Sequence, residues 1–129
     1  MRSIPFKISD VFMDLAEVEG MLSLEGDNLI IEYQTKDGIL GILKTQLKEL
    51  RISVGDLDSI EYRKKVLKGL VDIRGKKMSV FANFPGSQHG NIRLKINKDH
   101  RDAAEQFVED VSLRISEYKV RHIDDDLLS

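Results

Sequence analysis

The period of the hydrophobic pattern changes near residue 98. From Glu17 to Asn97, apolar residues mostly recur at every second position, which is the spacing of strands with one buried face. From Asp99 to about Tyr118 they recur at every third or fourth position, which is the spacing of an amphipathic helix. The chain therefore predicts a run of strands followed by one C-terminal helix, without helices between strands for parallel crossovers.

The predicted strands are separated by turns rich in glycine, asparagine and lysine. Residues 18–24 alternate, turn at 26–28 and return with Leu29, Ile31 and Tyr33 on one face, which predicts a hairpin. Further alternating segments are 50–52, 57–66, 71–73, 78–84 and 92–96. About seven short antiparallel strands at this spacing are typical of a barrel or an orthogonal sandwich. The apolar segment 39–43 has no clear period and receives no assignment.

The C-terminal helix, predicted for about 99–118, carries an apolar stripe that includes Phe107, Val111 and Ile115. No strand follows it, so we expect this stripe to dock onto the sheet. Leu113 falls roughly opposite the stripe, and we expect it to be exposed or in an interface.

The ends of the chain are less regular than its centre. Residues 1–16 are predicted to be an N-terminal extension, in which Ser9 would suit the cap of a short helix. The main domain is expected to cover residues 17–118, with strands over about 17–97. Residues 119–129, with three consecutive aspartates, are expected to be an acidic tail.

Composition narrows the classes of function. The 129 residues suit one domain with its own core. The absence of cysteine excludes disulfides, thiolate metal sites and a cysteine nucleophile, and it agrees with the cytoplasmic location that we expect. The net charge of -2 gives the whole protein no field toward nucleic acid or an anionic membrane, so we expect no nucleic-acid partner.

Four stretches carry a resemblance to a known family: 20–29 (GMLSLEGDNL), 50–60 (LRISVGDLDSI), 84–87 (FPGS) and 101–104 (RDAA). Together with the order of the elements, they resemble the small bacterial domains of the pleckstrin-homology-like (PH-like) superfold. The resemblance implies two nearly orthogonal sheets whose open corner is plugged by the helix. Such domains bind lipids, peptides or other domains, or act as assembly units, so the fold alone does not choose a ligand.

One departure from the resemblance concerns lipid binding. Members that bind phosphoinositides commonly carry lysine and arginine around the first hairpin turn. Here the turn at 23–28 reads SLEGDN and is acidic. This argues against headgroup binding at the usual site.

The densest basic cluster follows one of the predicted strands and comprises Arg63, Lys64, Lys65 and Lys68. It suits an anion site for phosphate, a lipid headgroup or an acidic peptide. Short charge runs also mark ordinary solvated loops, and strand alternation would separate Lys64 from its neighbours. We identified no apolar anchor beside the run, so vesicle binding is not the expected main function.

An apolar contact surface is the other candidate site. Phe81 differs in parity from its neighbours in the predicted strand 78–84, so we expect it to point outward. With Leu113 and Phe12 it would form a surface for a protein partner or for a second copy, most simply in a dimer. In the alternative, the N-terminal segment folds back and covers it.

No catalytic or metal-binding constellation stands out. His89, His100 and His122 are too far apart in the chain to predict a metal site, and Ser87 with His89 lacks an orienting acid. We therefore expect no catalytic residue, metal or cofactor. The sequence predicts a non-enzymatic PH-like module for protein binding or self-assembly, with lipid-headgroup or anion binding through residues 63–68 as the alternative.

Overall fold

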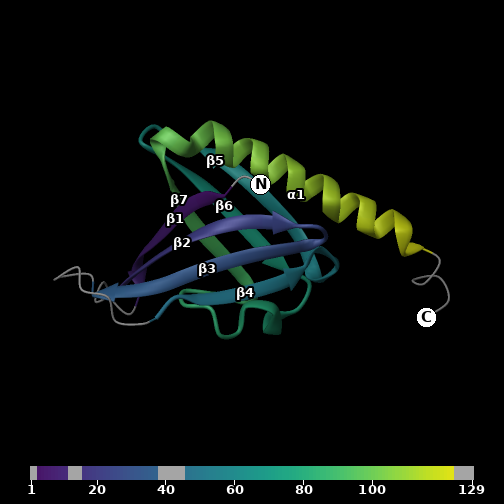
Figure 1. The fold of residues 1–129 in the computed structure, drawn as a ribbon, viewed down its shortest axis with the longest axis horizontal. Coiled ribbons are helices and arrows are strands. Elements are labelled where there is room, and N and C mark those ends of the chain that lie inside the picture. Colours follow the sequence, from purple (N-terminus) through teal and green to yellow (C-terminus); the bar gives the residue numbers. More distant parts are fainter. Residues whose placement is uncertain (1–2, 12–15, 38–45, 124–129) are drawn as a thin grey trace.

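The computed structural model describes residues 3–11, 16–37 and 46–123. Within these ranges, seven antiparallel strands form one sheet, and a single α-helix follows them (Figure 1). The strands are β1 (Ile4–Val11), β2 (Ala16–Glu25), β3 (Asn28–Asp37), β4 (Lys48–Ser53), β5 (Leu57–Lys64), β6 (Lys68–Gly75) and β7 (Asn91–Asn97). The helices are η1 (Val54–Asp56), η2 (Met78–Phe81) and η3 (Lys98–His100), all 3-10, and α1 (Arg101–Arg121). The expected fold class, mostly β with one C-terminal α-helix, is confirmed.

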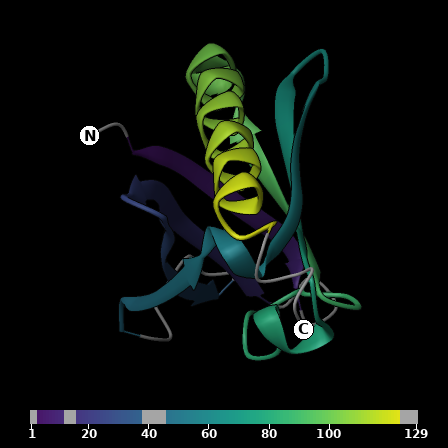
Figure 2. The same cartoon turned by 90° about the vertical axis from the view of Figure 1, so that its right-hand side faces the viewer.

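The strand order in the sheet is β4-β3-β2-β1-β7-β6-β5. Strands β1 to β4 form one half and β5 to β7 the other, and within each half strands that follow one another in the chain pair antiparallel. The halves join at β1 and β7, where Lys7 pairs with Lys95. The sheet is not closed between β4 and β5, and its halves face each other with α1 over one open side (Figures 1 and 2). This arrangement is consistent with a sandwich or a PH-like arrangement.

The N-terminal segment is a strand, so the short helix suggested for it was wrong. β1 pairs with β2 from Ile4 opposite Leu22 to Ile8 opposite Val18. Ile4 and Phe6 are 1% and 3% exposed, because alternate side chains of β1 point into the core. The pairing with β2 and β7 hydrogen-bonds the backbone on both sides, and this tertiary pairing outweighs the local signal of a helix cap.

The segment 78–84 is not a strand, and the outward position predicted for Phe81 was also wrong. It begins with η2, which turns the side chains of Phe81 and Phe84 to the same side. Phe81 is 0% exposed and Phe84 3% exposed, and the Phe84 ring lies 4.8 Å from that of Tyr33. Two buried aromatic rings stabilise this segment as a plug on the core, which a strand with alternating faces would not allow.

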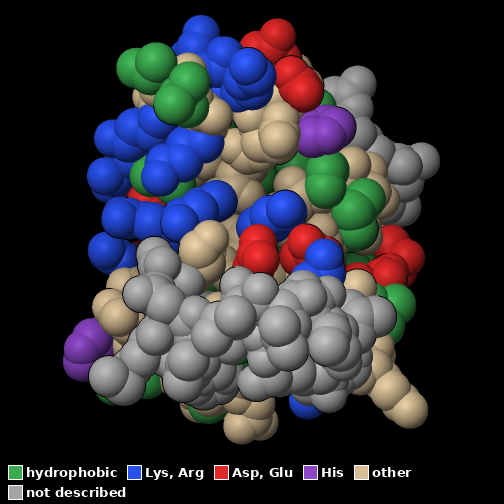
Figure 3. Space-filling model, turned by 90° about the vertical axis from the view of Figure 1, so that its left-hand side faces the viewer, with side chains coloured by type: hydrophobic (Ala, Val, Ile, Leu, Met, Phe, Trp, Pro, Cys, Tyr) green, Lys and Arg blue, Asp and Glu red, His purple; other side chains and the backbone are tan. Residues whose placement is uncertain are grey.

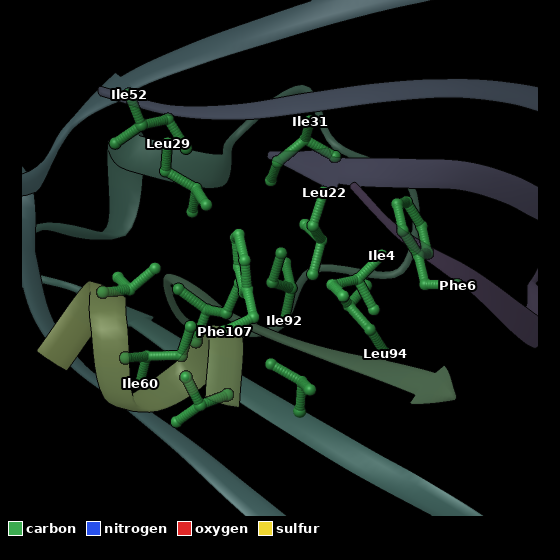
Figure 4. Packing of buried hydrophobic residues seen from close by; sticks show 14 of the residues in the cluster. Ile4, Phe6, Leu22, Leu29, Ile31, Ile52, Ile60, Ile92, Leu94 and Phe107 are labelled. Atoms are coloured by element: carbon green, nitrogen blue, oxygen red, sulfur yellow. The ribbon is translucent and has the colours of Figure 1, made fainter. Parts of the chain in front are cut away.

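The core fills the space between the two halves of the sheet (Figure 4). Leu22 and Ile31 enter it from β2 and β3, and Ile92 and Leu94 enter it from β7. Phe107 reaches the same cluster from α1. The helix therefore belongs to the core and does not merely lie on its surface.

The predicted docking of the C-terminal helix is confirmed. Its buried residues are Ala104, Phe107, Val108, Val111 and Ile115. The helix is preceded by η3, where Asn97 Oδ1 accepts a hydrogen bond from the Asp99 N–H at 2.9 Å. This cap satisfies a backbone donor at the start of the helical segment and fixes the turn from β7 into α1.

Candidate functional site

The turn between β5 and β6 carries two exposed aliphatic side chains. The Lys65 N–H donates to the Lys68 carbonyl at 2.9 Å and closes the turn around Val66 and Leu67. These side chains are 88% and 76% exposed, the highest values among the large hydrophobic residues that the structure describes. Both lie within the basic run at 63–68, beside which we had identified no apolar anchor from the sequence. We call residues 64–68 the hairpin tip.

The hairpin tip is held in place by the start of α1. Arg101 Nη1 donates to the carbonyl of Lys65 at 2.7 Å and to that of Val66 at 3.2 Å. The same guanidinium donates through Nε to the carbonyl of Lys98 at 3.2 Å. Because three carbonyls from two segments bind one side chain, the turn is fixed against the core domain.

The four predicted cations do not form one patch. Lys64, Lys65 and Lys68 are exposed on the hairpin tip, and none forms an ion pair with another described residue. Arg63 instead lies on the outer face of the sheet, where its Nε is 3.4 Å from Asp72 Oδ2. The tip therefore combines three lysine charges with two aliphatic side chains. Arg63 precedes the tip on β5, and its side chain lies on the sheet.

A groove of about 610 Å³ runs over the outer face of β5, β6 and β7. We call it the outer groove. Its charged and histidine lining includes Arg63, Asp72, Arg74, His89, Arg93 and Lys95. Lysine and arginine side chains crowd along this side of the molecule (Figure 3). Only Arg63 of this set was predicted as a site residue, because Asp72, Arg74, Arg93 and Lys95 come from strands that the sheet brings beside β5, and His89 comes from the turn before β7.

Asp72 is the acidic centre of the outer groove. Arg93 binds it through two hydrogen bonds, Nε to Oδ1 at 2.7 Å and Nη2 to Oδ2 at 3.5 Å. Arg63 approaches the same carboxylate from β5. The hydrogen bond and charge of Asp72 raise the pKa of Arg93 above its ordinary value. One carboxylate thus orients two arginines on neighbouring strands.

His89 stands on a tight turn at the edge of the outer groove. Gln88 and Asn91 exchange backbone hydrogen bonds at 2.9 and 3.0 Å, and between them His89 and Gly90 have φ values of 55° and 81°. Two positive φ values in a two-residue turn are the mark of type I′ geometry, which favours asparagine or glycine. Histidine, like asparagine and aspartate, is among the non-glycine residues that occur more often than most at positive φ, so His89 can occupy this position.

The acidic turn that argued against headgroup binding belongs to the second hairpin, β2–β3. Because β1 is a strand, the first hairpin is β1–β2, and its connecting residues 12–15 lie outside the described part of the chain. In the β2–β3 turn, Asp27 binds Arg114 at 3.6 Å and Arg121 at 2.9 Å. The Arg121 hydrogen bond lowers the pKa of Asp27. The acidity of this turn therefore helps to hold the helix.

Phe81 and Leu113, two of the three residues proposed for an apolar interface, are not brought together by the fold. Phe81 is buried in the core. Leu113 is 59% exposed on α1, as expected for a residue opposite the buried stripe. Phe12 lies outside the described residues. Of the two members of that set that the structure describes, Leu113 is the exposed one.

Comparisons with protein-family models, with curated proteins and with solved structures each found no match. In the described ranges, no three His, Asp or Glu side chains gather as a metal site would require. None of the described helices is long and apolar enough to cross a membrane. The hairpin tip and the outer groove are therefore the candidate functional sites.

Proposed function

We propose that this chain is a non-enzymatic PH-like module that docks onto anionic lipid surfaces through its hairpin tip. One observation carries the proposal: Val66 and Leu67 are almost fully exposed between Lys65 and Lys68 on a turn that is fixed to the domain. Aliphatic side chains flanked by lysines suit the boundary between lipid headgroups and acyl chains. The strand order and the terminal helix support the PH-like part of the proposal.

The interactions available at the tip suit reversible binding. Each basic residue near an anionic leaflet adds about 1 kcal/mol of attraction, and the tip has three lysines with Arg63 beside them. Burying one valine or leucine side chain adds about 1.5–3 kcal/mol. Immobilising the protein at the surface costs part of this total. We therefore expect binding to anionic vesicles that falls as the salt concentration rises. Replacing both Val66 and Leu67 by polar residues should weaken this binding strongly.

The hairpin tip is a better candidate than an apolar protein interface for two reasons. Phe81, the first member of that interface, is buried and cannot contact a partner. Leu113 is exposed on α1 without any other proposed interface residue beside it in the described part of the chain. Self-association through Leu113 is the alternative outcome, and light scattering of the wild type and Leu113→Glu separates it from lipid binding.

Vesicle sedimentation tests the proposal. The probes are phosphatidylcholine vesicles with and without phosphatidylserine, each at low and high salt. The test variant is Val66→Ser with Leu67→Ser, and the control is Met78→Ser, which changes an apolar side chain that is 67% exposed on η2. We expect pelleting with phosphatidylserine only, weakened by high salt, and at least about tenfold weaker in the tip variant, equivalent to about 1.4 kcal/mol.

Two results would overturn the proposal. One is a monomeric wild type that fails to pellet with phosphatidylserine vesicles at low salt. The other is a tip variant that pellets as well as the Met78→Ser control. A dimeric wild type that becomes monomeric in Leu113→Glu, without any vesicle binding, would favour self-assembly instead.

A further inference from the structure

The outer groove has a regular arrangement of charge that the hairpin tip does not use. In the register of the sheet, Leu70 lies between Arg63 and Lys95. Two residues further along β6, Asp72 lies between Glu61 and Arg93. These residues share the face of the sheet that points away from the core, since alternate side chains of a strand share a face. The charged members of this set form a grid along the groove, whose lining also includes the apolar residues Ile8, Ile73 and Ile92 but not Leu70.

The grid has more positive than negative charge. Arg63, Arg74, Arg93 and Lys95 line the groove, against Glu61 and Asp72. Asp72 is already bound by Arg63 and Arg93. Arg74 forms no ion pair with another described residue. Its neighbours on the adjacent strands, Ser59 and Asn91, are both neutral. The groove therefore offers an arginine that no described acid neutralises, next to two arginines that Asp72 holds in place.

We propose that the outer groove binds an extended acidic peptide segment of a partner protein. Side chains two apart on one strand, such as Arg93 and Lys95, are separated by about 6.6–6.8 Å. Acidic residues at alternate positions of an extended peptide have the same spacing, so their carboxylates match successive cations. Arginine binds carboxylate in a planar, bidentate geometry, which adds specificity to the charge.

The floor of the groove favours a peptide over nucleic acid. Glu61 and Asp72 lie among the cations and would repel a continuous line of phosphates. A peptide can carry a neutral side chain where it passes over these carboxylates, whereas a nucleic-acid strand carries a phosphate at every nucleotide. Aromatic side chains, on which bases stack, do not line this groove within the described residues.

His89 gives the groove a defined end. Its type I′ turn would be satisfied by asparagine, yet the groove is lined there by an imidazole. An imidazole N–H can donate to a peptide carbonyl or carboxylate. His89→Asn therefore removes this donor while keeping, or improving, the turn.

Fluorescence anisotropy of labelled synthetic peptides tests the inference. The probe is an alternating peptide of glutamate and serine, and its comparison is a peptide of the same composition with the glutamates in one block. The test variants are Arg74→Gln and His89→Asn. The control is Arg51→Gln, which removes a half-exposed arginine of β4 that pairs with Glu25 and Glu49.

We expect the alternating peptide to bind more tightly than the block peptide. Arg74→Gln should weaken binding about tenfold, the loss of roughly one charge-assisted contact, and His89→Asn should weaken it less. Arg51→Gln should have no effect. Equal binding of the two peptides, or unchanged binding by a folded Arg74→Gln variant, would overturn the inference. So would tighter binding of a single-stranded oligothymidine that Arg74→Gln abolishes.

This inference is independent of the lipid proposal, and the same variants distinguish the two. Val66→Ser with Leu67→Ser should leave peptide binding unchanged, because neither residue lines the groove. Arg74→Gln should leave the contribution of the apolar tip to vesicle binding unchanged. If vesicle binding fails while peptide binding follows Arg74, the groove stands alone as a protein-binding site.

Discussion

Asp27 accepts a hydrogen bond from Arg121 Nη2 at 2.9 Å, although the two residues are 94 positions apart. The pair joins the β2–β3 turn to the last turn of α1. Arg114 approaches the same carboxylate and also donates to the carbonyl of Gly26 at 2.9 Å. The far end of the helix therefore has polar contacts in addition to the core packing, which continues along α1 to Ile115 and Tyr118.

This attachment predicts a dependence of stability on pH. The pKa of Asp27 is lowered from its ordinary value of 3.8, mainly by the hydrogen bond from Arg121. A carboxyl whose pKa is lower in the folded state stabilises above its unfolded pKa, and this contribution is lost as pH falls through the folded value. Asp27→Asn should therefore lower the free energy of unfolding at neutral pH, with a difference from wild type that shrinks below about pH 4.

Chemical denaturation over a pH series measures this difference. Asp58→Asn is the matched control, since Asp58 is exposed on β5 and forms no ion pair with another described residue. A difference between wild type and Asp27→Asn that persists unchanged well below pH 4 would show that the charge of Asp27 is not its cause.

Gly20 should tolerate no side chain. A Cβ there would overlap the backbone oxygen of Glu32 and would lie 2.7 Å from Cζ of Phe6. Gly20→Ala must therefore move β3 or the Phe6 ring, and we expect a loss of about 1–3 kcal/mol in the free energy of unfolding. Gly26→Ala is the comparison, because its Cβ meets no atom but its φ of 57° costs a non-glycine residue about 1 kcal/mol. A Gly20→Ala variant as stable as wild type would contradict the prediction.

Phe81 and Met78 lie on opposite sides of η2, one facing the core and the other facing solvent. Phe81 is 0% exposed and Met78 is 67% exposed on the same short helix. Phe81→Ala should lower the free energy of unfolding by about 3–5 kcal/mol, because it leaves a cavity. Met78→Ala should change it by less than about 0.5 kcal/mol. Urea denaturation of both variants checks this, and similar losses in the two would mean that the segment 78–84 does not close the core.

Phe107 and Leu113 allow the same comparison of a buried and an exposed side chain on α1. Phe107 is 4% exposed in the core and Leu113 is 59% exposed. We expect Phe107→Ala to cost about 3–5 kcal/mol, the usual range for a large core truncation. Leu113→Ala should lie within about 0.5 kcal/mol of wild type. A loss below that limit for Phe107→Ala would mean that the helix is not docked through this side chain.

The alternation of side chains was sufficient to predict most of the sheet. Leu29, Ile31 and Tyr33 share the face of β3 that enters the core cluster, and the structure buries all three; Ile30, on the opposite face, is buried as well. β1 was missed because a plausible helix cap at Ser9 competed with a short alternation, and the pairing that decides the outcome comes from distant residues. The segment 78–84 was misassigned because Phe81 and Phe84, three residues apart, were taken for strand positions although the spacing also fits a 3-10 turn.

A candidate site could be predicted from the sequence only where its residues are contiguous in the chain. The hairpin tip is visible in the sequence, since Val66 and Leu67 stand between lysines in a turn, yet their exposure was overlooked. The outer groove was not predictable in the same way. Arg74 and Arg93 join Arg63 through the register of three strands, and no local pattern specifies that register.

The join between Lys7 of β1 and Lys95 of β7 has a consequence for synthesis of the protein. Chains fold from the N-terminus as they leave the ribosome, and β1 to β4 can pair with one another as soon as they emerge. Their apolar face, which includes Leu22 and Ile31, is then covered only when β7 and α1, which follow later in the chain, have been made. A nascent chain that ends before residue 91 thus has β1 to β4 and the β5–β6 hairpin without the strand that joins them. We expect this stage, with its uncovered core, to be the most exposed to aggregation and to chaperones.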